Sequence, residues 1–339
     1  YHHEYEYGNR DVIAPLTAEE ANLLHAQTLA RTNGWWRAVI SAMQGLRHLY
    51  GHTGRRAEWA RLVNEIVPDF VDPDTDRPLP GREEYWDIIT HYRARLAEEV
   101  RQWLEVERLE SIRVDWNRQR AALALKIPAE ELNDSHRHAL RSLAVSLERL
   151  GQAQRAQSEL ECIRTFEEAI QICQCIGDKP EEAILAFNLG HSYLLLLALR
   201  DLTRAERWYR RSLELLDKRD RLGRGKCLIP LGNVAYERFQ DALAATPAPS
   251  PSPPAGKTLA GEGSAYSPAS GERGELLKHL NDALGFYQQA LVLLPPNAVD
   301  DLAVTHNQLG QIYRSAGDPD RALPHYRESI RYKDMAGNV

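Results

Sequence analysis

Few residues in this sequence could perform chemistry, and their spacing argues against a shared site. Cys173 and Cys175 stand two positions apart, as do His136 and His138. In a helix, residues i and i+2 point to different sides, so neither pair can hold one metal ion jointly. Spacing alone leaves open a catalytic Cys–His pair from distant parts of the chain, although no cysteine has a supporting local signature.

A short Gly–Lys–Thr stretch resembles the end of a phosphate-binding loop. It lies at Ala255–Thr258, but Pro251 stands where the leading glycine should be, and no apolar strand precedes it. Patterns of the H-E-x-x-H or G-x-S-x-G type do not occur in the sequence. We therefore expect a linker lysine here, and a protein that is not an enzyme and has no cofactor or metal.

Basic and aromatic residues are mixed at Arg207–Arg211, a feature that can indicate nucleic-acid binding. The formal net charge is −6 and the pI is about 6.1, so we expect no nucleic-acid and no anionic-membrane partner. The longest apolar run, Tyr193–Leu199, is far too short to span a bilayer, and the first residues carry no secretory signal. Cysteines confined to expected helices favour a cytoplasmic protein with reduced thiols.

The elements that position these residues are expected to be helices throughout. Residues 1–16 form an N-terminal tail without a period, and 17–134 form irregular helical hairpins, either degenerate repeats or a cap. Thr17, with Glu20 three positions on, has the spacing of a capping box and predicts the first helix start. Further helices are predicted at about 35–50, 57–66, 82–101 and 104–125, with a proline-rich loop over 67–81.

A leucine–glycine pair followed by aromatic residues recurs in the second part of the chain. Leu189 and Gly190 are followed by Tyr193, Ala205 and Tyr209. The same skeleton returns in Leu309, Gly310, Tyr313, Ala322 and Tyr326, and the pair itself also occurs at Leu150–Gly151 and Leu231–Gly232. This skeleton resembles that of the tetratricopeptide repeat, whose two-helix unit has a nominal period of about 34 residues.

The resemblance covers 135–339 and implies an all-α fold, a right-handed α-solenoid of tetratricopeptide-like hairpins. The steps from Leu150 to Leu189 and from Leu189 to Leu231 exceed the nominal period, so the repeats are similar to the long ones of kinesin-light-chain-type arrays. Arrays of that kind are common in large bacterial signalling proteins. Glycine, alanine and aromatic positions of the repeat are expected to form the packing between helices.

A Pro/Ser/Gly-rich insertion at 245–274 interrupts the array. Its composition cannot bury enough apolar surface to offset the entropy of ordering, so it is expected to be disordered. Ala283 and Tyr287 supply the second helix of the interrupted repeat, expected from about Leu276. Pro230 lies inside the first helix of this repeat, so that helix is expected to start late, near Cys227, or to be kinked.

In the tetratricopeptide family, the first helices of the hairpins line a concave groove. Carried onto this sequence, two groove positions per repeat give a candidate partner-binding set: Gln152, Arg155, His191, Leu194, Asn233, Tyr236, Gln311 and Arg314. Amide, basic and aromatic side chains suit a groove that holds a peptide or helix. Some members clamp a terminal carboxylate with lysine and asparagine. Here the lysine position reads Glu148, Phe187, Ile229 and Asn307, so that clamp is absent.

These features predict a protein–protein interaction scaffold that binds a peptide or helical segment. An alternative hypothesis is a sensor or regulatory segment of a larger, ATPase- or protease-coupled signalling protein. It rests on Tyr1 standing in place of an initiator Met, and on the array stopping at Val339 where a capping helix is expected. An uncapped last repeat would also permit self-association. Nucleic-acid binding is the weakest alternative.

Overall fold

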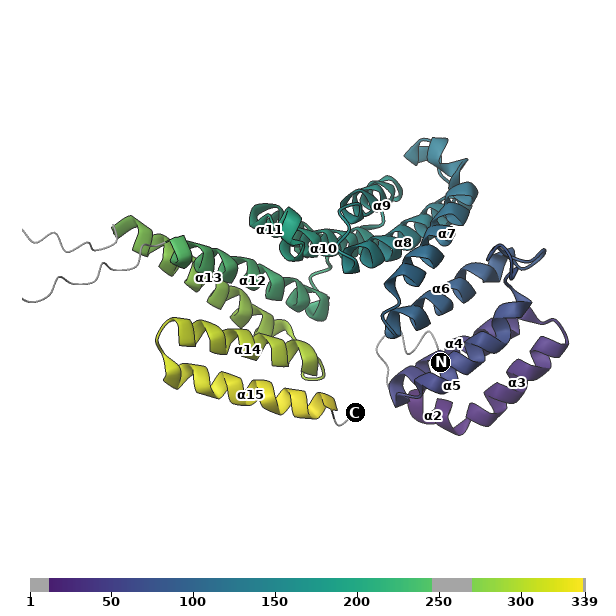
Figure 1. Ribbon diagram of the computed structural model, residues 1–339, viewed down its shortest axis with the longest axis horizontal. Helices are drawn as coiled ribbons and strands as arrows, with labels where there is room; N and C mark the ends of the chain where they lie inside the picture. Colours follow the sequence, from purple (N-terminus) through teal and green to yellow (C-terminus); the bar gives the residue numbers. More distant parts are fainter. Residues whose placement is uncertain (1–11, 246–269, 338–339) are drawn as a thin grey trace, which may run out of the picture. The chain divides into compact units, whose positions relative to one another are not determined.

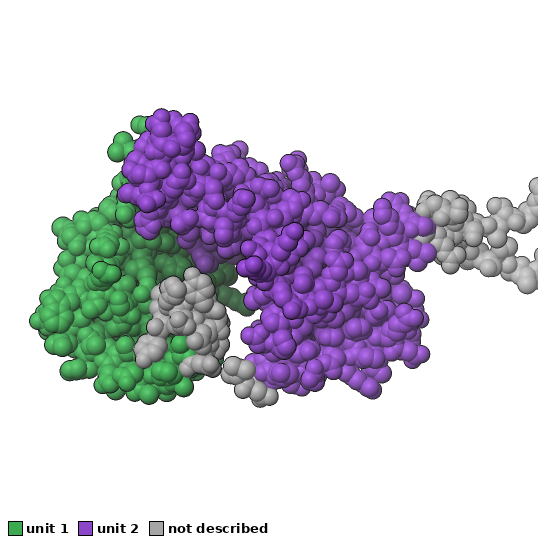
Figure 2. Space-filling model, turned by 180° about the vertical axis from the view of Figure 1, so that it is seen from behind, with its two compact units in different colours: residues 1–126 green, residues 127–339 purple. Residues whose placement is uncertain are grey.

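The computed structural model describes residues 12–245 and 270–337, and helices make up most of them (Figure 1). Within these two ranges the only β pairing is an isolated bridge between Val71 and Pro78. The predicted all-α class is therefore confirmed. The chain divides into two compact units, unit 1 over 1–126 and unit 2 over 127–339 (Figure 2). This boundary precedes the expected one between 134 and 135.

The described part of unit 1 contains five longer helices, one short helix and two 3₁₀ turns, most of them packed around one apolar core. The elements are α2 (Ile13–Ala18), α3 (Glu20–Thr32), α4 (Trp36–Thr53), α5 (Arg56–Ile66), the 3₁₀ turn η2 (Val67–Asp69), α6 (Glu83–Glu99), α7 (Trp103–Ala121) and the 3₁₀ turn η3 (Ala124–Lys126). Trp59, Trp86 and Tyr92 are buried in this core, and the Trp59 and Tyr92 rings meet edge to face at 5.0 Å. Such ring pairs add stability beyond the area they bury.

The predicted capping box at Thr17 is wrong. Thr17 lies inside α2, and its hydroxyl donates to the carbonyl of Ile13. The hydroxyl is therefore satisfied within its own helix and does not cap α3, which begins at Glu20 without a side-chain cap. A threonine near a helix start can bond back to the preceding turn as readily as forward.

Unit 2 is an array of antiparallel helix pairs, each packed against the next (Figure 1). The pairs are α8 (Asp134–Ala156) with α9 (Cys162–Ile176), α10 (Lys179–Leu195) with α11 (Leu202–Leu215), α12 (Arg221–Ala245) with α13 (Ser270–Leu293), and α14 (Val299–Ser315) with α15 (Pro319–Gly337). Asn133, Asp178 and Asp201 cap α8, α10 and α11, their side chains accepting from backbone N–H groups.

In each hairpin of unit 2, a glycine of the first helix packs against an aromatic ring of the second. A Cβ atom added to Gly190 would lie 2.9 Å from Cδ1 of Tyr209, which is completely buried. Carbon atoms repel one another at this distance, so only glycine admits the ring. The other hairpins repeat the contact with Gly151 and Phe166, Gly232 and Tyr287, and Gly310 and Tyr326.

Two helix starts in the interrupted repeat differ from expectation. Helix α12 begins at Arg221 and runs through Pro230, so the late start near Cys227 is wrong. Helix α13 begins at Ser270, inside the range expected to be an insertion. The expected disorder of 246–269 concerns residues outside the described ranges. Assignment of residues 17–134 as degenerate repeats or a cap stays a prediction.

Candidate functional site

The predicted groove residues all lie on the first helices of the unit 2 hairpins, and none is fully buried. Seven are half-buried and Arg314 is exposed. By contrast, the leucine and glycine that precede them in the repeat are mostly buried, as Leu189 and Gly190 are. The first helices therefore keep one accessible polar face. Whether that face binds a partner remains a prediction.

Tyrosines on the second helices hold two of the groove residues in place. The hydroxyl of Tyr209 lies 2.8 Å from Nδ1 of His191, and the hydroxyl of Tyr287 donates to Oδ1 of Asn233 at 2.6 Å. The ring that packs under the repeat glycine thus also orients the side chain that follows this glycine. His191 and Asn233 consequently stabilise their own hairpins, and their assignment to a binding groove stays a prediction.

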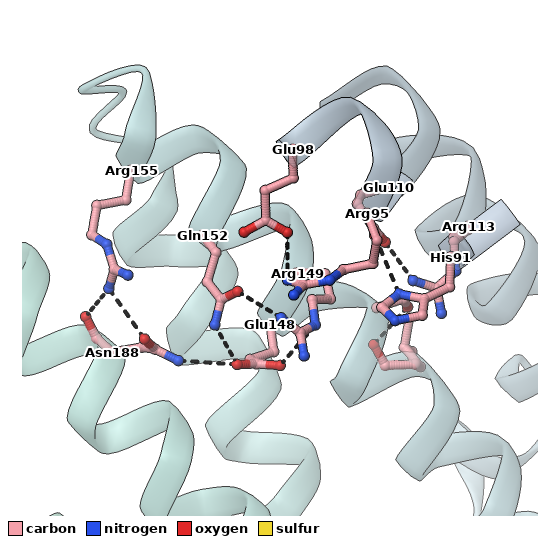
Figure 3. Close-up of polar contacts among 12 residues, drawn as sticks. His91, Arg95, Glu98, Glu110, Arg113, Glu148, Arg149, Gln152, Arg155 and Asn188 are labelled. Atoms are coloured by element: carbon pink, nitrogen blue, oxygen red, sulfur yellow. Dashed lines mark hydrogen bonds and ion pairs between the residues drawn. The ribbon is translucent and has the colours of Figure 1, made fainter. Parts of the chain in front are cut away.

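Gln152 has a different arrangement because its hairpin carries Phe166, which has no hydroxyl. Its amide Nε2 donates to Oε1 of Glu148 at 2.5 Å, and its Oε1 accepts from Arg149 at 3.0 Å (Figure 3). The Glu148 carboxylate also accepts from Nδ2 of Asn188 on α10 at 3.1 Å. This network links the first helices of two successive hairpins.

Arg155 completes the same network from the end of α8. Its guanidinium donates to the backbone carbonyl of Asn188 at 2.9 Å and to its Oδ1 at 3.2 Å (Figure 3). Burial lowers the pKa of Arg155, partly offset by nearby Cys162, Tyr209 and Glu148. The guanidinium also lies over the ring of Phe166, 5.8 Å from its centroid.

His191 lies among aromatic rings and stays neutral at neutral pH. The Phe187 ring lies 4.6 Å from it, centroid to centroid, and the Tyr209 ring meets it at 85°. Burial lowers the pKa of His191 to about 4, and the positive charge of Arg155 acts in the same direction. The imidazole can therefore accept or donate a hydrogen bond but does not supply a charge.

The remaining predicted residues are Leu194, Tyr236, Gln311 and Arg314, of which only Arg314 is exposed. The hydroxyl of Tyr236 lies 2.8 Å from Oγ of Ser315, linking α12 to α14. Leu194 is half-buried on α10. No hydrogen bond of the described residues involves the side chains of Gln311 or Arg314. These three side chains can be replaced without breaking a polar contact of the fold.

Two functional candidates escaped sequence reasoning, Asn188 and Glu148. Asn188 precedes Leu189, at a position that packs inside the repeat, and it is only 7% exposed. Glu148 is 5% exposed and was considered only as a departure from the carboxylate clamp. A polar residue at a packing position needs a partner, and this signal was available in the sequence.

The remaining chemical candidates are dispersed. Cys173 is buried and Cys175 exposed, so the two thiols face different sides as expected. Within the described ranges no group of three or more His, Cys, Asp or Glu side chains could hold a metal ion. The Gly–Lys–Thr stretch at Ala255–Thr258 lies outside those ranges. None of the described helices combines the length and apolarity needed to cross a membrane.

The basic and aromatic stretch on α11 is largely engaged within unit 2. Tyr209 is buried under Gly190, and Trp208 is half-buried. Arg210 donates to Glu206 at 2.7 Å, and Arg211 donates to Glu182 of α10 at 2.8 Å. These carboxylates compensate two of the positive charges that a phosphate backbone would require.

Comparison with known proteins gives one family match. The model of the family described as tetratricopeptide repeat matches residues 305–334, which contain most of α14 and α15. None of the curated proteins compared matches the sequence.

Solved structures with a similar arrangement include BtubC (BKLC) from P. vanneervenii, 16% identical, with a TM-score of 0.45, covering 96% of this chain and 93% of that one. They also include the human IFIT1 dimer with m7Gppp-AAAA, 13% identical, with a TM-score of 0.41, covering 96% of this chain and 66% of that one. TM-scores below 0.5 carry no argument about function. The family match therefore identifies a tetratricopeptide-type repeat at 305–334 of unit 2, and the same glycine–aromatic contact recurs in all four helix pairs of this unit.

Proposed function

We propose that unit 2 is a protein-interaction scaffold whose polar face, formed by α8, α10, α12 and α14, binds a peptide or helical segment of a partner. The observation that supports this is the accessibility of the same two repeat positions in all four hairpins. Repetition at a fixed phase presents a continuous row of side chains to one extended ligand. In this proposal the protein acts by binding and not by catalysis.

The compartment proposed for this activity is the cytoplasm. Cys162, Cys173 and Cys227 are free and buried, and Cys175 is free and exposed. An exposed free thiol persists best where the cell keeps thiols reduced.

The experiment uses a photo-crosslinking amino acid at Leu194, on the proposed face, and at Arg207, exposed on α11, as the control. In the native cell, a partner should be captured from position 194 and not from position 207. Calorimetry with that partner should then show at least tenfold weaker binding to a Gln311→Ala/Arg314→Glu variant, with Arg207→Glu as the charge-matched control.

These substitutions are chosen because they spare the hydrogen bonds of His191, Asn233 and Arg155. Loss of binding therefore reports the face and not a damaged fold. Unchanged affinity for every captured partner after Leu194→Asp, Gln311→Ala and Arg314→Glu would rule the proposal out.

We also propose that the outer face of α15 mediates self-association. Ile330 and Ile170 occupy equivalent positions, each four residues after the aromatic residue of its hairpin. The Ile330 side chain is 60% exposed, whereas that of Ile170 is only 4% exposed. Two further apolar side chains of α15 are accessible: Leu323 is 51% exposed and Met335 is 44% exposed. Ile330→Asp should abolish any dimer seen by light scattering, and Val292→Asp, at an exposed site on α13, should not.

We also propose that unit 2 does not bind nucleic acid, because carboxylates already pair with Arg210 and Arg211. A mobility-shift titration with single-stranded RNA and DNA should show no salt-dependent complex. A complex that weakens steeply as salt rises would contradict this part of the proposal.

A further inference from the structure

Unit 1 contains a small basic pocket that the proposed function does not use. Its volume is about 280 Å³, and side chains of α4, α5 and α6 line it, among them Arg47, Arg56, Tyr92, Arg95 and Glu99. We call it the arginine pocket. All three helices belong to unit 1, so the pocket lies within one compact unit. Pockets for drug-sized ligands start at about 300 Å³, so this one suits a smaller molecule.

The buried Tyr92 gives the strongest sign of a ligand. Its side chain is 1% exposed, and its hydroxyl has no hydrogen-bond partner among the described residues. The Arg47 guanidinium lies over the phenol ring, 6.0 Å from its centroid, but arginine can only donate and cannot accept the phenolic proton. Burial raises the pKa of Tyr92 to about 12, with Arg47 acting in the opposite direction, so the hydroxyl keeps its proton at neutral pH. Because an unpaired buried donor is unfavourable, an acceptor atom of a ligand would be stabilised here.

Neighbouring contacts hold the walls of the arginine pocket in place. The Tyr92 ring meets the Trp59 ring of α5 edge to face at 5.0 Å. On α4, the hydroxyl of Tyr50 donates to Oε1 of Glu20 at 2.9 Å, and the guanidinium of Arg55 lies over the Tyr50 ring at 4.4 Å. A ligand would therefore meet a prearranged site, with little ordering entropy to offset.

The charges that line the arginine pocket favour an anion with two negative charges. Three guanidinium groups and the carboxylate of Glu99 leave a net charge of two positive units, and a protonated His48 would only add to it. Arg95 shares its charge with Glu98, which pairs with it at 2.5 Å. A phosphate monoester carries about −1.5 to −2 charges at pH 7 and three acceptor oxygens, whereas a carboxylate has one charge and two oxygens. The planar guanidinium also matches the geometry of phosphate oxygens.

We propose that the arginine pocket of unit 1 binds the phosphate group of a small phosphate monoester. Arg47, Arg56 and Arg95 donate to the phosphate oxygens, and Tyr92 gives its phenolic hydrogen to an acceptor of the same ligand. Hydrogen bonds between charged groups are roughly twice as strong as neutral ones, so a small ligand can be held by few contacts. No residue of the proposed polar face of unit 2 takes part.

The test titrates glycerol phosphate into the full chain, in a phosphate-free buffer at fixed ionic strength, and follows binding by calorimetry. One saturable site with a Kd of about 1 mM or tighter is expected. Succinate, a dianion without a phosphate group, should bind at least tenfold more weakly. A peptide that contains phosphoserine should bind no more tightly than glycerol phosphate, because the pocket has no room for the rest of the peptide.

Four variants test the lining. Arg56→Gln should weaken binding at least tenfold, whereas Arg61→Gln, at an exposed position of the same helix outside the pocket, is the matched control and should leave the affinity unchanged. Tyr92→Phe should weaken binding at least threefold without destabilising the unliganded protein, because the hydroxyl has no hydrogen-bond partner there among the described residues. Glu99→Gln should tighten binding, because it removes a carboxylate that repels the ligand. Circular dichroism checks that each variant is folded.

The proposal is overturned if glycerol phosphate does not bind saturably, or if Tyr92→Phe binds it as tightly as the parent. Equal losses in Arg56→Gln and Arg61→Gln would also overturn it, because attraction would then come from the overall charge and not from the pocket. Succinate binding as tightly as glycerol phosphate would refute the phosphate group, and tighter binding of the phosphoserine peptide would refute the small ligand. None of these results depends on the face of unit 2.

Discussion

The substitution Gly190→Ala, which adds one methyl group, tests the packing between Gly190 and Tyr209. In Gly190→Ala the new Cβ would lie 2.9 Å from the buried ring, which cannot move away without displacing its neighbours. We expect the free energy of unfolding of unit 2 to fall by about 1–3 kcal/mol, the usual range for an overpacked core. Urea denaturation followed by circular dichroism measures the change.

Gly285, inside α13, is the matched control. No atom lies within 4 Å of a Cβ added there. Gly285→Ala should raise the stability by about 0.5–1 kcal/mol, because alanine has the higher helix propensity. Equal effects of the two substitutions would show that the contact with Tyr209 does not restrict position 190.

Glu181, in the first turn of α10, should make unit 2 sensitive to pH. Its Oε1 is buried without a hydrogen-bond partner among the described residues, and burial raises the pKa of Glu181 to about 7, with the charges of Glu148 and Asp178 adding to the rise. The folded state therefore binds this proton more tightly than the unfolded state, in which the pKa is near 4.5. The stabilisation is complete below pH 4.5 and is lost as the pH rises through 7.

Glu181→Gln removes this ionisation. The variant should be more stable than the parent by about 1–3 kcal/mol at pH 8 and equally stable at pH 4. His191 acts in the opposite direction, because its folded pKa of about 4 lies below the unfolded value of 6.5. Once Glu181 is replaced, unfolding curves should therefore show stability falling as the pH drops from 6.5 to 4.

Glu167→Gln, at an exposed position of α9, is the control and should change stability by less than about 0.5 kcal/mol at either pH. If Glu181→Gln destabilised the protein at pH 8, the carboxylate would have to be held by a partner, contrary to the structure.

At the scale of elements, a buried ion-pair network joins α6 to α7. Arg113 is 3% exposed and donates to Glu110 at 2.6 Å and to both oxygens of Asp87, at 3.1 and 2.9 Å (Figure 3 shows Arg113 and Glu110). Arg113→Leu would leave Glu110 buried without this counter-charge. We expect a loss of about 3–5 kcal/mol in the stability of unit 1, the usual result of removing one partner of a buried pair.

Arg95→Leu supplies the comparison on α6, because Arg95 pairs with Glu98 at a largely exposed site. It should cost less than about 1 kcal/mol, since water screens exposed pairs. Chemical unfolding of both variants distinguishes the two cases. Similar losses would mean that burial does not govern the strength of the α6–α7 network.

The hairpins of unit 2 were predictable because their packing signal is local. Gly190 and Tyr209 belong to consecutive helices of one hairpin, so both residues of the contact lie within a short stretch of sequence. The start of α12 at Arg221 was not predictable, because a proline inside a helix, here Pro230, costs about 3 kcal/mol. Cys227, Leu228, Ile229, Pro230 and Leu231 are all buried, and tertiary burial outweighs that penalty.

The candidate face was only partly predictable. The repeat phase placed His191 and Asn233 on the first helices, but their bonds to Tyr209 and Tyr287 depend on how close the ring approaches each helix. The contact of Arg155 with Asn188 joins different hairpins, and its geometry depends on the stacking angle, which a motif does not encode.

At the scale of the whole molecule, we expect the two units to unfold separately, since each has its own core. The core cluster of unit 1 runs from Val12 to Tyr92, with Ile112 and Trp116 packed against it, and all of it lies before the boundary at 126. Fragments 1–126 and 127–339 should each melt cooperatively by circular dichroism, because a domain with its own core can fold alone.

Ile89 and Leu189, both completely buried, allow the same question to be asked in the intact chain. Ile89→Ala should lower the free energy of unfolding of unit 1, and Leu189→Ala should lower that of unit 2. We expect each loss to be about 2–5 kcal/mol, the usual effect of such truncations. Calorimetry should resolve which transition moves. If either substitution shifted both transitions equally, the units would unfold as one, and separate fragments should then fail to fold.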